Sequence, residues 1–166
     1  MDQAPPLARA WYGAGGSASA VTRSFANAPD MMETLMPFLG QIMDESSIDL
    51  ATKELVIMRV SRLNGCRYCL AAHRPVALDA GVPGEQLAAV CDEADLETLP
   101  ARERAIVAWV DQVTREAGAI TDAQLAATLD HIRDDQLVEL TVLAGTITML
   151  NHYCTAFDIP PPGSER

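Results

Sequence analysis

The chain has 166 residues, enough for one domain with a substantial core, and 49% of them are hydrophobic while only 5% are aromatic. This balance is typical of packed helices rather than of a β-sandwich. With 23 acidic residues against 12 basic ones, the formal net charge is -11, which argues against nucleic acid or an anionic membrane as a partner.

The first segment, residues 1–16, is rich in Pro, Gly and Ala and is predicted to be a flexible arm. It lacks the basic start and apolar core of a secretory signal, and no apolar run approaches the roughly 20 residues of a membrane helix. We therefore expect a cytoplasmic protein, in which four cysteines do not indicate a disulfide framework. Residues 17–160 are expected to form the domain, and residues 161–166 a tail.

Seven segments beyond the arm have the apolar spacing and the end signals of helices. In chain order they are 31–43, 50–63, 66–81, 83–94, 101–118, 122–132 and 134–157. Asp49 and Thr121 are predicted to cap two of them, and Asn64-Gly65 to end the second. No segment shows the alternation of a strand bounded by turns. The sequence therefore predicts an all-α fold, a single domain of about six to eight helices.

The stretch NGCRYCLAAH contains a Cys-x-x-Cys motif, Cys66 and Cys69, followed four residues later by His73. Both cysteines fall in the first turn of the helix predicted after Gly65, so their sulfurs share one face and can close a short disulfide. Unpaired N–H groups at a helix N-terminus favour thiolate over thiol and lower the pKa of a cysteine there. His73 projects along the same face, where it can accept a proton.

Glu54 lies on the preceding predicted helix, among residues that are expected to be buried. Two helices joined by a tight Asn-Gly turn can pack against each other, which would bring Glu54 toward His73 and the thiols. A buried carboxylate needs a partner or has a raised pKa, so Glu54 is a candidate proton carrier. The alternative is a structural ion pair with a nearby arginine. The candidate arginines are Arg59, Arg62 and Arg74.

Several interpretations of the thiols remain open: a disulfide that turns over, a metal site, or a structural role. A thioredoxin fold is excluded, because that fold places its motif after a strand. Zinc could use Cys66, Cys69, His73 and Glu54, which would make the chain a zinc-stabilised helical binding module. Structural zinc sites usually draw a second Cys or His pair from a separate turn, however, and the sequence shows none.

The other two cysteines and the glycine-rich segment suggest no further site. Cys91 and Cys154 have no partner at motif spacing, so we expect them to be core or interface residues. Residues 13–20 are glycine-rich but lack the strand and spacing of a dinucleotide loop. No cofactor is therefore expected.

The spacing of Glu54, Cys66, Cys69 and His73 resembles the signature of the alkylhydroperoxidase D branch of the carboxymuconolactone decarboxylase-like superfamily. The surrounding KELVIMRVSRLNGCRYCLAAH is similar to that family's core almost throughout. The resemblance extends over roughly residues 30–160. The closing LNHYCTAFDIP, with Asn151, is similar to the family's last helix.

This resemblance implies a thiol peroxidase that reduces hydroperoxides. Cys69 would be the peroxidatic cysteine and Cys66 the resolving one, giving a Cys66–Cys69 disulfide. Glu54 and His73 would relay protons. A dithiol reductant, for example a lipoyl-bearing protein, would reopen the disulfide, and the chains would assemble into homotrimers or hexamers.

One position departs from the best-characterised relatives, which carry a histidine just before the second cysteine. This chain has Tyr68 there, and Tyr68 is therefore a further candidate site residue. Within thiol chemistry, the alternative to a peroxidase is a general disulfide oxidoreductase or a redox sensor.

Overall fold

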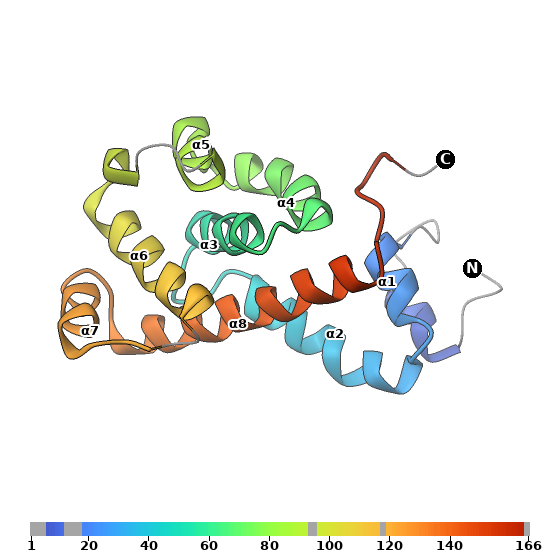
Figure 1. Cartoon of the computed structure of the whole chain (residues 1–166). Coiled ribbons are helices and arrows are strands. Elements are labelled where there is room, and N and C mark those ends of the chain that lie inside the picture. Colours follow the sequence, from blue (N-terminus) through green and yellow to red (C-terminus); the bar gives the residue numbers. More distant parts are fainter. Residues whose placement is uncertain (1–5, 12–17, 93–95, 117–118, 165–166) are drawn as a thin grey trace.

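The computed structural model describes residues 6–11, 18–92, 96–116 and 119–164. Within these ranges the chain forms eight α-helices, two short 3-10 helices and no strand, which confirms the predicted all-α single domain (Figure 1). In chain order the elements are η1 (Pro6–Trp11), α1 (Ala20–Phe25), α2 (Pro29–Met43), α3 (Leu50–Leu63), α4 (Arg67–Asp79), α5 (Gly84–Asp92), η2 (Leu96–Thr98), α6 (Ala101–Arg115), α7 (Asp122–Leu129) and α8 (Asp134–Ala156).

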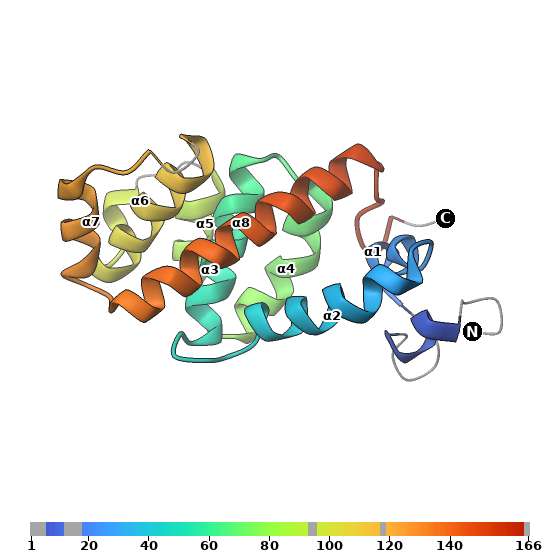
Figure 2. The same ribbon diagram turned by 90° about the horizontal axis from the view of Figure 1, so that it is seen from below.

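Helix α3 forms the centre of the molecule and contacts α4, α5, α6 and α8 (Figure 1). All of its residues from 52 to 61 are buried. Val56, Ile57 and Val60 join a core shared with α2 and α8, while Leu55 and Met58 join a second core under α4 and α5. The long helix α8 crosses the molecule beside α2 and α3 (Figure 2). A helix with apolar residues around most of its surface is stable only when covered on all sides, as α3 is.

Two buried cations on α3 have anionic partners, as buried charges require. The ammonium of Lys53 lies 2.6 Å from the Glu139 carboxylate on α8, and it also donates to two main-chain carbonyls at the end of α2. The guanidinium of Arg59 donates two hydrogen bonds to the Asp111 carboxylate on α6. These pairs fix α8 and α6 to the central helix.

The connection between α3 and α4 follows the predicted turn chemistry. Asp49 caps α3 by accepting from the Thr52 N–H, and the helix ends before Gly65, whose φ of 65° is a left-handed conformation that favours glycine. The Cys66 N–H donates to the Ser61 carbonyl, which satisfies one of the last groups of α3. Helix α4 therefore begins one residue beyond the turn and packs back against α3.

The predicted arm, residues 1–16, is described only over residues 6–11, which form η1. Ala8 is fully buried there and Trp11 packs against the core, where η1 contacts α2. The other arm residues, and residues 165–166 of the predicted tail, lie outside the described part of the chain.

Helix α1 was not expected from the sequence pattern, because it has only six residues and follows a glycine-rich segment. Its stability comes from contacts with α8. The Ser24 and Tyr153 hydroxyls lie 2.6 Å apart, and the rings of Phe25 and Tyr153 are 4.7 Å apart. A helix this short is unstable alone, so packing rather than propensity determines it.

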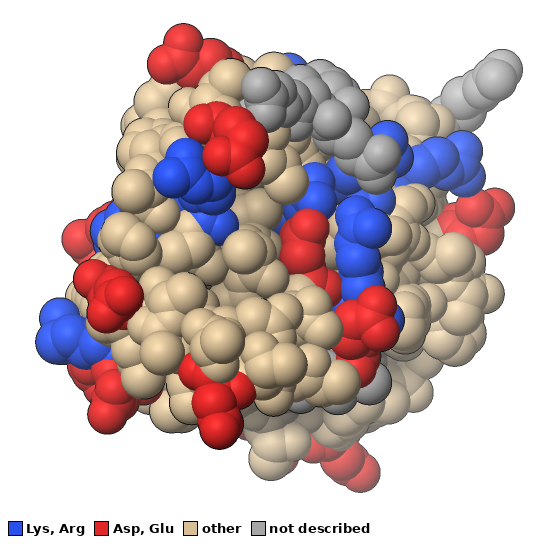
Figure 3. All heavy atoms as spheres, turned by 60° about the vertical axis from the view of Figure 1, so that its left-hand side comes forward, with Lys and Arg blue, Asp and Glu red and all other residues tan. Residues whose placement is uncertain are grey.

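The outer surface combines charged groups of both signs. On the side of the molecule turned forward in Figure 3, acidic and basic side chains are interspersed among uncharged ones. Searching the described residues for a helix with the length and apolarity needed to cross a bilayer gives none.

Candidate active site

The first turn of α4 places both motif cysteines at the predicted helix N-terminus. Cys66 is the N-cap residue, and its sulfur accepts a hydrogen bond from the Cys69 N–H at 3.3 Å. The two Sγ atoms are 2.8 Å apart and hydrogen-bonded, and both residues are buried. A sulfur in this capping position receives the N–H groups and the positive end of the helix dipole, which favour its thiolate.

Glu54 on α3 and His73 on α4 meet, as the sequence predicts. The His73 Nδ1 atom lies 2.9 Å from Glu54 Oε2 and 3.2 Å from Oε1. The Glu54 side chain is only 3% exposed, whereas that of His73 is 24% exposed. Because Nδ1 is engaged by the carboxylate, Nε2 is the nitrogen that remains for proton exchange with other groups.

A third cysteine, Cys154 of α8, completes the cluster. The sulfurs of Cys66, Cys69 and Cys154 all lie within 4.8 Å of one another, and all three residues are buried. Cys154 was expected to be a core or interface residue, and it is indeed buried in a core cluster, but its contact with both motif sulfurs was not predicted. It lies 85 residues after Cys69, so no local motif reveals it.

The four-ligand zinc set that the sequence left open as an alternative is not assembled. Among the described residues, the cluster of close ligand atoms consists of three cysteine sulfurs, and neither His73 nor Glu54 belongs to it. His73 instead binds Glu54. Cys91 lies in the other core, under α4 and α5.

Asparagines connect the thiol-bearing turn to α8. The fully buried Asn151 amide donates to the Ser61 hydroxyl at 3.1 Å and accepts from the Asn64 amide at 3.0 Å. These bonds fix the end of α3, and with it the start of α4, against α8. The neighbouring His152 points to solvent and is exposed, so it takes no part in this arrangement.

The three thiols differ in their protonation. Hydrogen bonds from Cys154 and Cys69 outweigh burial and lower the pKa of Cys66 to about 3. Contact with Cys154 lowers the pKa of Cys69, but the hydrogen bond with Cys66, burial and the Cys66 charge raise it overall to about 12. The pKa of Cys154 is also raised, by its hydrogen bonds to Cys66 and Cys69 and by burial. The cluster therefore holds one negative charge, mainly on Cys66.

Replacing Cys154 by alanine should raise the pKa of Cys66 by about 1–2 units, because one hydrogen bond to a charged group contributes about 1.5–3 kcal/mol. Folding lowers the Cys66 pKa, so the thiolate stabilises the folded chain. This contribution to stability is complete at pH values above the unfolded-state pKa of about 8.5. That contribution is lost as the pH falls toward 3. Ultraviolet thiolate absorbance of reduced, chelator-treated protein, titrated with acid, measures this pKa. A Cys91→Ala control should titrate like the wild type, and an unshifted Cys154→Ala curve would contradict the assignment.

A cavity of about 430 Å³ opens beside the thiols. Cys69, Cys154, His73 and Tyr68 belong to its lining. The rest of the lining is mostly apolar and comes mainly from η1, α1, α2 and α8. It includes Trp11, Ser19, Val21, Met36, Leu39, Gly40, Met43 and Leu150. Cys66 is not among the lining residues, so the cavity gives access to Cys69 rather than to Cys66.

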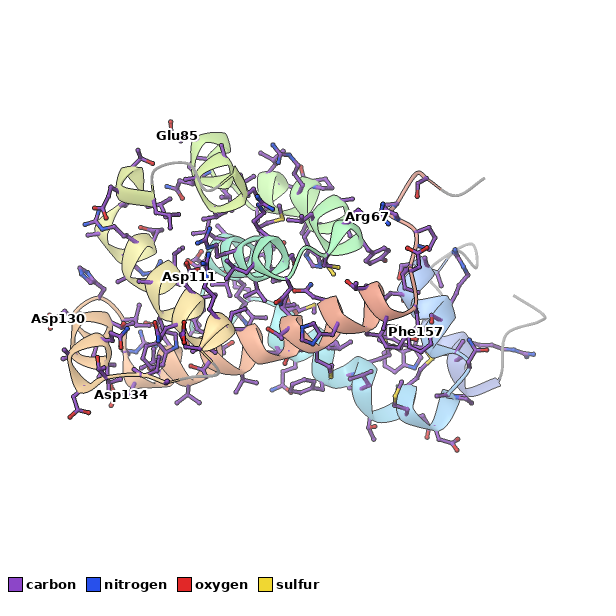
Figure 4. The ribbon with its side chains drawn as sticks, in the orientation of Figure 1. Arg67, Glu85, Asp111, Asp130, Asp134 and Phe157 are labelled. Carbon is purple, nitrogen blue, oxygen red and sulfur yellow. The ribbon has the colours of Figure 1, made fainter. Side chains whose placement is uncertain are left out.

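The thiol-bearing start of α4 lies near the end of α8. Figure 4 shows this through Arg67, in the first turn of α4, and Phe157, just after α8, which are on the same side of the molecule. The side chain of Arg67 forms an ion pair with Asp158 at 3.4 Å, and both are largely exposed. Tyr68, predicted as a possible site residue, is half-buried in the wall of the cavity.

Comparison with known proteins places the sequence in a family. Residues 29–112, about half of the chain, match the sequence pattern of the carboxymuconolactone decarboxylase family. The uncharacterized protein YdfG of Bacillus subtilis (strain 168) is 24% identical over 130 residues, which are 78% of this chain and 88% of that protein.

Solved structures share the fold. An alkylhydroperoxidase AhpD core structure, an uncharacterized peroxidase-related protein from Ralstonia eutropha JMP134, has a TM-score of 0.80 and 18% identity over 89% of this chain and 79% of its own. An uncharacterized peroxidase-related protein from Silicibacter sp. TM1040 has a TM-score of 0.86 and 19% identity, over 98% and 88% of the two chains. The chain belongs to the carboxymuconolactone decarboxylase family and has the fold of its alkylhydroperoxidase D-like branch.

Proposed function

We propose that the protein is a thiol peroxidase that reduces organic hydroperoxides with Cys69 and Cys66. One observation carries this proposal: a hydrogen-bonded Cys pair and a Glu54–His73 pair meet at an apolar cavity onto which Cys69 and His73 both open. The peroxidase-related fold of the solved relatives agrees with it.

In the first step, the negative charge moves from Cys66 to Cys69 along their 2.8 Å hydrogen bond, which leaves Cys66 as the thiol. The Cys69 thiolate attacks the distal oxygen of the hydroperoxide and the O–O bond breaks. His73, with its positive charge stabilised by Glu54, donates a proton to the leaving alkoxide, which departs as an alcohol. Cys69 is now a sulfenic acid.

In the second step, Cys66 attacks the Cys69 sulfur. The S–O bond breaks, and the sulfenic oxygen leaves as water with the proton of the Cys66 thiol. If the proton on His73 is counted as the one that the resting thiolate has lost, both steps together convert two thiols and one hydroperoxide into one disulfide, one alcohol and one water. A dithiol must then supply two electrons and two protons to restore the pair.

The walls of the cavity indicate the substrate class. Methionine, leucine, valine and tryptophan residues line the cavity together with Cys69, and few polar groups are available to hold a small hydrated peroxide. An apolar hydroperoxide of moderate size would bury its hydrocarbon part there, and each buried CH₂ contributes about 0.8 kcal/mol. We therefore propose that organic hydroperoxides are better substrates than hydrogen peroxide.

Filling the cavity at Gly40 tests this specificity. Gly40 lines the cavity on α2, and a Cβ added there meets no atom within 4 Å, so Gly40→Leu should be accommodated. We expect kcat/KM for cumene hydroperoxide to fall about tenfold or more, since excess volume in an apolar pocket has effects of that size. Activity with hydrogen peroxide should be retained. Equal loss with both substrates would contradict a cavity that selects by size.

The activity itself is tested by following cumene hydroperoxide with an excess of dihydrolipoamide as the dithiol. The proposal predicts multiple turnovers per chain, above the rate of the dithiol alone. Well-folded, fully reduced protein that consumes no hydroperoxide above this background would refute it.

A further inference from the structure

The sulfur of Cys154 gives the site a third donor that the proposed peroxidase cycle does not use. It comes from the last turns of α8 and meets Cys66 and Cys69 from the first turn of α4. It also faces two openings, the large cavity with Cys69 and a pocket of about 60 Å³ with Cys66. The proposed peroxidase cycle uses two thiols, so the third thiol in the cluster suggests an additional role.

The spacing of the three sulfurs suits one metal ion. A Zn–S bond is about 2.3 Å long, so two sulfurs in a tetrahedral zinc site lie about 3.8 Å apart. The three sulfurs here are within 4.8 Å of one another, and changes of roughly 1 Å in side-chain position would bring all of them into a coordination sphere. The amide N–H of Cys69 already donates to the Cys66 sulfur, as second-shell donors do at metal thiolates.

The donor set determines which metal it would take. Among the described residues, only sulfur atoms belong to this cluster, and thiolates select soft ions such as Zn²⁺ and Cu⁺ over Mg²⁺ or Ca²⁺. Cys69 and Cys154 line the large cavity, so a water from that side could occupy a fourth position. Three protein ligands with one open position form a common arrangement of zinc.

We propose that Cys66, Cys69 and Cys154 form a thiolate binding site for a soft d¹⁰ metal ion, with Zn²⁺ as the ion to test. The same sulfurs cannot hold the metal and form the Cys66–Cys69 disulfide at the same time. Metal binding and thiol oxidation are therefore mutually exclusive states of the site.

This exclusivity also gives the metal a regulatory effect, which rests on the proposed peroxidase function. The hydroperoxide takes two electrons from the two sulfurs as its O–O bond breaks, and two solvent protons complete one alcohol and one water. The S–S bond forms, and Zn²⁺ leaves with its charge unchanged. Bound zinc would thus inhibit the enzyme, and excess hydroperoxide would release it.

The binding test uses reduced protein, with Zn²⁺ measured by competition with a chromophoric chelator and Cd²⁺ by its sulfur-to-metal charge-transfer absorbance. We expect one ion per chain and an absorbance typical of three thiolates. Cys154→Ser and Cys154→Ala should each weaken Zn²⁺ binding by more than about 100-fold, because loss of a ligand exceeds the effect of a second-shell change. Cys91→Ser, a buried cysteine in the other core, should bind like the wild type.

Two results would overturn the site: no binding by the reduced wild type, or equal affinity in the wild type and both Cys154 variants. A measurement on the wild-type protein tests the same site. Protein whose Cys66–Cys69 disulfide has been formed with diamide should lose the site, and undiminished binding would contradict it. Metal-free protein separates the two proposals: reduced, metal-free protein that binds one Zn²⁺ through three thiolates but is not oxidised by cumene hydroperoxide would refute the peroxidase and leave the metal site standing.

Discussion

Replacement of Cys69 by serine is expected to lower the turnover of organic hydroperoxides by at least about a thousandfold, because an alcohol at this position is a far weaker nucleophile than a thiolate. Cys69 is the motif cysteine that lines the cavity beside His73, so it is the sulfur that a substrate there can reach. Steady-state loss of cumene hydroperoxide with a dithiol donor measures the effect.

Two further variants identify the role of each sulfur. Cys66→Ser should permit one oxidation, leaving a sulfenic acid on Cys69 that a dimedone-type reagent traps, and should stop repeated turnover. Cys91→Ser, the same change at a buried cysteine outside the site, should keep full activity. The resting charge favours Cys66, so the decisive contrary result is a Cys69→Ser variant that still forms a sulfenic acid at a wild-type rate.

Replacement of Glu54 by glutamine should lower kcat/KM by about 10²–10⁴-fold, the usual contribution of general acid–base catalysis. Glutamine preserves the size of the side chain and can still accept from His73 Nδ1, but it removes the charge that stabilises the imidazolium. The loss should therefore be in the proton transfer to the alkoxide. The measurement is kcat/KM for cumene hydroperoxide as a function of pH.

A matched control is Glu103→Gln on α6, where the carboxylate pairs with the partly exposed Arg102. This change should alter neither activity nor stability by much, because such pairs contribute about 0–1 kcal/mol. If the Glu54→Gln enzyme is as active as this control at every pH, the Glu54–His73 pair does not contribute to catalysis. Thermal unfolding of both variants shows whether a loss of activity is caused by a loss of folding stability.

Local signals were sufficient to predict most of the fold. Asp49 caps α3 and Thr121 caps α7 through a capping box with Gln124, as short-range side-chain chemistry requires. Gly65 ends α3 with a positive φ. By contrast, α1 and η1 depend on contacts with Tyr153 on α8 and with α2, and no window of sequence contains such contacts.

In the candidate site, too, the features set by local sequence could be predicted and those set by tertiary contacts could not. Glu54 and His73 could be predicted to meet, because one tight turn joins their helices. Cys154 could not, since its approach depends on where α8 crosses α4. The cavity is lined by residues of η1, α1, α2, α4 and α8, which only tertiary packing brings together. Contacts between elements far apart in the sequence therefore add the third thiol and the apolar lining to a motif that the sequence alone predicts.

The central claim is tested most directly by mass spectrometry of the cysteines in reduced protein, before and after one equivalent of cumene hydroperoxide. The account predicts rapid loss of two hydrogens per chain, with the new bond mapped to Cys66 and Cys69 and with Cys91 still a thiol. Thiols that remain untouched in metal-free protein, or oxidation that spares Cys69, would contradict it.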